Sequence, residues 1–282
     1  MKYTQYENVD KFLERLINEF DRNESINGLM YGISLRLKKN PLEYGQKPLL
    51  AVVEDNSTIH LAALMTLPYN LQIRAPGTFS EECVEVLSKG LMENGWTLPG
   101  VRADKDLAEF FAKTWKTLHG CQYKVSMEQL LHELRHVKTI EYSPGEMREA
   151  NFQDIDRAVD WAQAFHRECF GENEPEGFID HVKKRVMSGE LFFWDHSGPV
   201  AMAARTRPTP NGESIALVYT PEEYRRSGYA TSVVASLSLR ILNDGKQFCC
   251  LYADAANPTS NSIYRKIGYA PVGIVVDINF EY

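Results

Sequence analysis

One loop in the last third of the chain has the composition of an anion-binding site. It reads Arg225-Arg226-Ser227-Gly228-Tyr229-Ala230 and separates an apolar run from an amphipathic one, so we expect it to join a strand to a helix. Small residues let backbone N–H groups approach an anion, and the first N–H groups of a helix have no internal partner. The helix dipole and two arginines add positive charge. The loop therefore predicts a pyrophosphate site.

The loop does not match the two commonest phosphate-binding motifs. No Gly-Lys-Ser/Thr follows it, as a Walker P-loop requires, and it lacks the third glycine and the later acidic residue of a Rossmann fingerprint. A glycine at a helix start is also compatible with a simple turn. The hexapeptide alone therefore leaves the kind of ligand open.

A second group of residues lies downstream of this loop. Asn257 and Pro258 favour a helix start, because Asn is a preferred N-cap and Pro a preferred first residue. Tyr264 stands two turns into that helix, and Gly268 favours its end. A phenol at this position can protonate a leaving group, although a partly buried structural tyrosine is the alternative.

Together the two groups resemble the GCN5-related N-acetyltransferase (GNAT) superfamily. The superfamily has a cofactor-loop pattern, Gln/Arg-x-x-Gly-x-Gly/Ala, and a later pattern in which Asn, six residues and Tyr precede a Gly-aromatic pair. The residues that meet these patterns are Arg225, Gly228, Ala230, Asn257, Tyr264, Gly268 and Tyr269. The resemblance covers about residues 147–282. The N-terminal half has Pro76-Gly77 where the loop would stand.

The resemblance implies transfer of an acetyl group from acetyl-CoA to a primary amine of a small molecule or an amino-acid-like acceptor. The amine attacks directly, without a covalent intermediate or a metal, and Tyr264 is the matching general acid. Asn257 is expected to contact the cofactor near its pantetheine arm. The strand positions that match the pantetheine contact are Val218, Tyr219 and Thr220, and the N–H groups that match the pyrophosphate contact run through Arg226, Ser227, Gly228, Tyr229, Ala230 and Thr231.

The sequence departs from the family pattern at the general base. Tyr252 stands where a glutamate base is frequent, so Glu213 and Asp254 remain candidates and no base is assigned. Glu222 replaces a frequent proline. For acceptor recognition the candidates are Trp161, Phe165, His166 and Phe170, with core packing as the alternative for each.

Hydrophobic periodicity predicts the element order helix, three strands, helix, strand, helix, strand twice along the chain. In the first half, helices are expected at 9–20, 83–92, 106–118 and 128–134, strands at 48–54, 59–67, 69–75 and 122–127, and a short apolar run at 96–101. In the second half, helices are expected at 154–170, 181–187, 228–242 and 258–267, strands at 191–194, 199–207, 213–219 and 248–253, and one or two closing strands at 269–280. The expected fold is α/β (α+β), with two tandem GNAT-like domains of mixed sheet flanked by helices. The division is 1–140, degenerate and without a cofactor loop, and 141–282, catalytic, with Ser143-Pro144-Gly145 as the boundary.

Composition limits the partners. A formal net charge of −7 disfavours a nucleic-acid partner, and no apolar run reaches the roughly 18 residues of a membrane span. The five cysteines form no CxxC or metal-ligand spacing. We expect a cytoplasmic protein that acts on a small molecule, with a homodimer left open. A non-catalytic CoA-binding or regulatory module, or a nucleotide- or phosphate-binding protein of another class, are the alternatives.

Overall fold

The structure is a computed structural model that describes residues 1–56, 58–171 and 174–282. The chain forms two compact units. The first contains Met1–Leu131, Asp254–Ala256 and Val272–Tyr282, and the second contains His132–Ala253 and Asn257–Pro271. The sequence placed the division at residue 140; in the structure the C-terminal strand lies in the first compact unit, where it pairs with a strand of that unit.

The first unit contains the strands and helices of the expected order, with one further strand and one further helix. Its elements are β1 (Lys2–Gln5), α1 (Val9–Arg22), α2 (Glu24–Lys39), β2 (Leu49–Asp55), β3 (Thr58–Met65), β4 (Leu71–Arg74), α3 (Glu81–Glu93), β5 (Gly100–Asp104), α4 (Lys105–His119) and most of β6 (Gln122–Leu134). The sheet runs in the order β1, β2, β3, β4, β5, β12, β6, where β12 is Ala270–Glu281. β4 and β5 are parallel, and β12 is antiparallel to β5.

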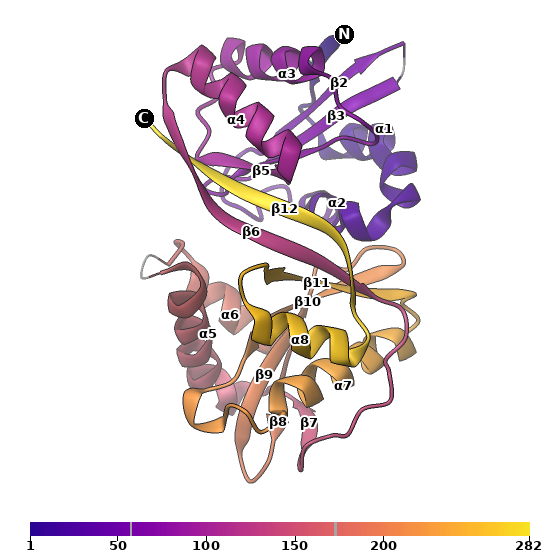
Figure 1. Cartoon of the computed structure of the whole chain (residues 1–282), viewed down its shortest axis with the longest axis vertical. Helices are drawn as coiled ribbons and strands as arrows, with labels where there is room; N and C mark the ends of the chain where they lie inside the picture. The colour runs from indigo at the N-terminus through magenta and orange to yellow at the C-terminus, as the bar shows by residue number, and fades with distance from the viewer. Residues whose placement is uncertain (57, 172–173) are drawn as a thin grey trace. The chain divides into compact units, whose positions relative to one another are not determined.

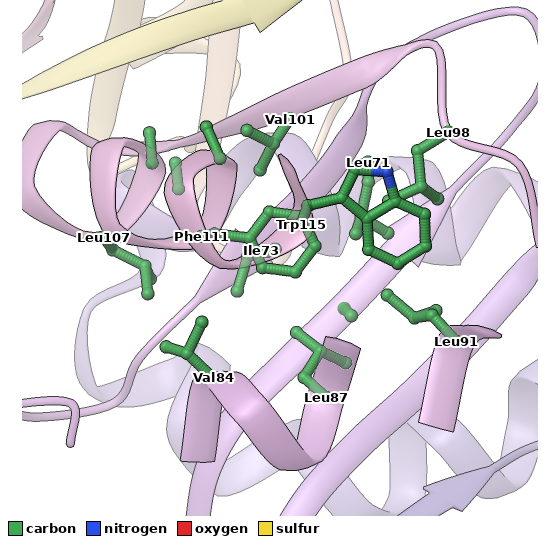
Figure 2. Close-up of a cluster of buried hydrophobic side chains, with 14 of the residues drawn as sticks. Leu71, Ile73, Val84, Leu87, Leu91, Leu98, Val101, Leu107, Phe111 and Trp115 are labelled. Carbon is green, nitrogen blue, oxygen red and sulfur yellow. The ribbon is translucent and has the colours of Figure 1, made fainter. Parts of the chain in front are cut away.

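Alternate residues of these strands build two cores, one on each face of the sheet. Leu49 and Ala51 face α3 and α4, whereas Leu50 and Val52 face α1 and α2. Figure 2 shows the first of these cores, where Trp115 and Phe111 of α4 meet leucines of α3 such as Leu87 above β4 and β5. Because large apolar side chains are fully buried on both faces of the sheet, each of the two cores contributes substantially to the free energy of folding.

The second unit repeats the same order. Its elements are β7 (Glu146–Glu149), a 3-10 turn (Phe152–Asp154), α5 (Ile155–Phe170), α6 (Phe178–Met187), β8 (Leu191–Asp195), β9 (Pro199–Thr206), β10 (Gly212–Tyr219), a 3-10 turn (Glu222–Tyr224), α7 (Tyr229–Asn243), β11 (Phe248–Asp254) and α8 (Pro258–Ile267). The strand order is β11, β10, β9, β8, β7, and β10 and β11 are parallel. The predicted repetition of elements is confirmed, and each half has one further strand and helix.

The second sheet is also covered on both faces. Phe192 and Trp194 of β8 pack with α7 and α8, whereas Leu191 and Phe193 pack with α5 and α6. The labels in Figure 1 place β10, α7, β11 and α8 next to one another in this unit. These are the elements that carry the predicted site.

Two local features differ from what the sequence predicted. Residues 128–134, predicted as a helix, form the second half of the long strand β6. Leu131, His132 and Leu134 are buried in the sheet, and strand pairing overrides their helical spacing. The helix α2 was not predicted, because its small residues carry little amphipathic pattern.

Among the described residues, no helix is long and apolar enough to cross a membrane. In the same part of the chain, no group of three or more His, Cys, Asp or Glu side chains could hold a metal ion.

Candidate functional site

The strand β10 bends before it reaches the predicted loop. Leu217 has a φ of 51°, and the pairing with β9 shifts between Ala216 and Tyr219, which is the mark of a β-bulge. The parallel pairing of β10 with β11 runs from Gly212 and Phe248 to Ser214 and Cys250 and then ends. The backbone beyond the bulge is therefore available to a ligand rather than to the neighbouring strand.

The predicted pantetheine positions lie on this bent segment. Val218, Tyr219 and Thr220 are half-buried. The Oγ1 atom of Thr220 is buried without a hydrogen-bond partner among the residues that the structure describes. A buried hydroxyl without a partner is costly, so this atom is a good position for a polar group of a bound molecule.

The loop itself presents a row of unpaired backbone donors. Arg226 and Gly228 have φ values of 66° and 80°, and Gly228 is the N-cap of α7. Within the described ranges, the N–H groups of residues 226–231 have no hydrogen-bond acceptor, whereas Arg225 N donates to Glu222 O and Ser232 N donates to Gly228 O. Unpaired N–H groups at the start of a 15-residue helix, with no acidic residue in its first turn, form an anion cradle.

Arg225 has a different environment from the one expected. Its Nη2 atom lies 2.7 and 2.9 Å from the two carboxylate oxygens of Glu168, its Nε donates to Thr220 O at 2.9 Å, and it stacks over Tyr219. The Glu168 carboxylate raises the pKa of Arg225. The guanidinium therefore fastens the end of α5 to the loop, while Arg226 is exposed and carries the loop's other positive charge.

A serine that sequence reasoning treated only as a boundary residue holds the loop from outside. Ser143 Oγ donates to Ser227 O at 2.7 Å, and Ser143 N donates to Ser232 Oγ at 2.9 Å. Trp194 fixes the same segment by donating from Nε1 to Pro144 O at 3.0 Å. No spacing in the sequence indicates these contacts, because they join residues that lie 50 to 89 positions apart.

The second motif forms a capped helix as predicted. Asn257 is the N-cap of α8, and its Oδ1 accepts a hydrogen bond from Ser260 N at 3.0 Å. Its Nδ2 makes no hydrogen bond to the part of the chain that the structure describes, so this exposed amide has a donor to offer. The helix ends at Gly268, whose φ is 122°.

Tyr264 is buried on α8, with 7% of its surface exposed. Its ring lies beside Tyr269 and beside His132, at centroid distances of 6.0 and 5.9 Å. Burial raises the pKa of the Tyr264 phenol, so it remains protonated at neutral pH. Its hydroxyl has no hydrogen-bond partner among the described residues, whereas the Tyr269 hydroxyl is paired with Ser238 at 2.8 Å.

His132 was not predicted, and it lies fully buried against α8. Its Nε2 is 3.0 Å from Asn261 Oδ1, and its Nδ1 has no partner within the described residues. Burial lowers the pKa of His132 more than the Asn261 hydrogen bond raises it, so the imidazole is neutral at pH 7.

The candidates for the general base differ in burial and in their hydrogen bonds. Glu213 is buried and accepts two hydrogen bonds from Arg205, at 2.9 and 2.6 Å, so both of its carboxylate oxygens are engaged by the guanidinium. Asp254 is exposed and accepts from Ala256 N at 2.8 Å. Tyr252 is half-buried on β11.

The acceptor candidates all lie on α5. The Trp161 ring packs on Phe193 and Tyr219, at centroid distances of 5.4 and 6.2 Å, so it reaches the bent strand. His166 is buried against Phe170 and Phe178. Phe165 contacts Phe170, which is more than half exposed. Trp161 also lines a cavity of about 320 Å³ with the β8–β9 turn and Tyr224.

Comparison with known protein families finds a match in the part of the chain that carries these residues. The model of the family described as FR47-like protein matches residues 195–273, which include the loop and the α8 motif. No curated protein matches the chain.

Several solved structures share the fold along the whole chain. A Drosophila protein from structural genomics has a TM-score of 0.70 at 12% identity, covering 98% of this chain and 97% of its own. A GCN5-related N-acetyltransferase from Sphaerobacter thermophilus has a TM-score of 0.61 at 14% identity, covering 99% and 95%. A GNAT-family acetyltransferase from Colwellia psychrerythraea has a TM-score of 0.57 at 14% identity and covers all of both chains. The predicted resemblance to tandem GNAT proteins is confirmed at the level of the fold.

Proposed function

We propose that this chain is an acetyl-CoA-dependent N-acetyltransferase that acetylates a primary amine of a small molecule or an amino-acid-like acceptor. The observation that carries the proposal is the row of unpaired N–H groups at residues 226–231, at the start of α7 and beside the bent strand β10. The GNAT fold of the chain supports acyl-CoA-dependent transfer in general.

Each part of the site has a distinct task. Acetyl-CoA would supply the thioester. The N–H groups of residues 226–231 would bind the pyrophosphate, with the Arg226 charge adding long-range attraction. The Thr220 hydroxyl and the Asn257 amide would offer polar contacts to the pantetheine arm.

Tyr264 would act as the general acid. Its phenol remains protonated at neutral pH because burial raises its pKa, and its hydroxyl has no competing partner among the described residues. Protonation of a departing thiolate by a positioned acid typically accelerates a reaction by about 10²- to 10⁴-fold. The acceptor amine must lose a proton as it attacks, and both carboxylate oxygens of Glu213 are already engaged by Arg205. We infer that water carries this proton.

The proposal is tested by following thiol release from acetyl-CoA with a panel of primary amines, amino acids included. At least one amine should release thiol faster than the uncatalysed reaction and yield the N-acetyl product by mass spectrometry. If acetyl-CoA shows no binding by calorimetry, the proposed function is wrong.

One observation favours a second candidate, a non-catalytic CoA-binding module. No carboxylate occupies the Tyr252 position, and Glu213 is tied to Arg205. This alternative predicts tight acetyl-CoA binding and no thiol release with any amine of the panel. The two candidates therefore differ in turnover rather than in cofactor affinity.

A further inference from the structure

The N-terminal unit has its own cavity, at the place that corresponds to the proposed acetyl-CoA site of the second unit. The parallel pairing of β4 and β5 covers Leu71 with Val101 and Gln72 with Arg102 and then ends, as that of β10 and β11 does. A cavity of about 470 Å³ lies where these strands end, a size typical of small-molecule sites. All of its lining residues belong to the first unit.

This cavity is not suited to a pyrophosphate. The N-terminus of α3, which corresponds to α7, is capped by its own Ser80, whose side chain accepts a hydrogen bond from Cys83 N. Glu81 and Glu82 fill the first turn with negative charge. Compared with the N-terminus of α7, a phosphate group here would meet two carboxylates and would have one N–H donor fewer, so CoA binding is disfavoured.

The polar side chains of the cavity carry both signs of charge. Arg74 is 8% exposed and gives one hydrogen bond to Asp104, at 2.8 Å. Its Nε and Nη2 atoms have no partner among the described residues, so a buried guanidinium has donors in reserve for a carboxylate. Asp106 is exposed and forms no ion pair in the described part of the chain, so it can accept from an ammonium group.

The rest of the cavity wall is apolar, and the positive and negative side chains that line the cavity are equal in number. Leu107, Leu131 and Phe79 line the cavity, and Leu107 and Leu131 are buried. Lys105, also in the lining, is held by Glu128 at 3.0 Å. Equal numbers of cations and anions favour a neutral zwitterion over a multiply charged anion.

We propose that the N-terminal unit binds a free α-amino acid with an apolar side chain. The carboxylate pairs with Arg74, the ammonium with Asp106, and the side chain packs on Leu107, Leu131 and Phe79. This site is separate from the proposed transfer site and does not depend on it.

The test is calorimetric titration of the full chain with L-phenylalanine, with 3-phenylpropionate and phenethylamine as probes that lack one charge each. Phenylalanine should bind at least tenfold more tightly than either analogue, because each lacks one charge-assisted contact. Equal binding of the three probes, or no binding of phenylalanine, would overturn the proposal.

Two variants locate the site. Arg74→Gln should weaken phenylalanine binding at least tenfold. Gly77→Phe should abolish it by placing a ring in the cavity, and a Cβ atom added at Gly77 meets no atom within 4 Å, so the substitution causes no clash at this carbon. Both variants should bind acetyl-CoA as the parent does. Phenylalanine binding that survives Gly77→Phe would place the amino acid elsewhere and contradict the assignment.

Discussion

Gly228 gives the sharpest test of the cofactor loop. Its φ is 80°, and a Cβ atom at this position would lie 2.7 Å from Ser143 Oγ. Gly228→Ala therefore adds left-handed backbone strain of about 1–2 kcal/mol and displaces the Ser143 hydroxyl from Ser227 O, a hydrogen bond worth about 0.5–1.5 kcal/mol. The total is about 1.5–3.5 kcal/mol, or about a tenfold to several-hundred-fold loss of acetyl-CoA affinity if the loop must adopt this conformation to bind.

The structure supplies matched controls for this substitution. Gly245→Ala places the same kind of strain after the other end of α7, with a φ of 96° and no atom within 4 Å of the added Cβ. It should lower the melting temperature without changing acetyl-CoA affinity. Ser143→Ala removes the hydroxyl that Gly228→Ala would strike, so the double variant should lose less affinity than the two single losses add up to.

Calorimetry with acetyl-CoA and thermal unfolding of all four variants separate the two effects. The expected result is a loss of affinity that is large in Gly228→Ala, smaller in the double variant than the sum of the two single losses, and absent in Gly245→Ala. Parental affinity in a folded Gly228→Ala variant would refute the reasoning, because the loop would not be the cofactor site.

Three further predictions follow from side-chain contacts. Glu168→Gln should free the Arg225 guanidinium and tighten acetyl-CoA binding a few-fold at low salt, an effect that fades at high ionic strength; weaker binding in calorimetry would contradict it. The pKa of His132 is lowered on folding, so the unfolded chain takes up the proton first as pH falls below about 6.5, and the free energy of unfolding should decrease there. His132→Gln should flatten that slope in chemical denaturation at several pH values, and an unchanged slope would exclude His132 as its source. Leu87→Ala should cost about 2–5 kcal/mol in the same assay, with acetyl-CoA affinity kept, because Leu87 is fully buried in the core of the first unit; a loss under 1 kcal/mol would contradict that packing.

The sequence predicted those parts of the fold whose secondary structure is set by local signals. The α8 boundaries at Pro258 and Ile267 were predicted because an N-cap, a proline and a terminal glycine are all local signals. Residues 128–134 were misread because their leucine spacing suits a helix, and only pairing within the sheet makes them a strand. The same limit explains the domain division, since the partner of β12 is β5, far away in the sequence.

The candidate site likewise combines features that local sequence signals predict with contacts between distant segments that they do not. The glycine at a left-handed helix start and the N-cap Asn257 are local features that the motifs encode. The tether of Ser143 to the loop and the capture of Arg225 by Glu168 depend on contacts between distant segments, so no spacing reveals them. Arg225 illustrates the consequence, because the carboxylate that engages its guanidinium lies 57 residues away in the sequence.

The most direct test of the proposed chemistry compares two adjacent tyrosines. Tyr264→Phe removes a hydroxyl without a described partner, and Tyr269→Phe removes one that is paired with Ser238. We expect Tyr264→Phe to lower kcat by about 10²- to 10⁴-fold with acetyl-CoA affinity unchanged, whereas Tyr269→Phe should lower stability and keep kcat. A Tyr264→Phe enzyme with a kcat close to that of the parent would contradict the role of Tyr264 as the general acid.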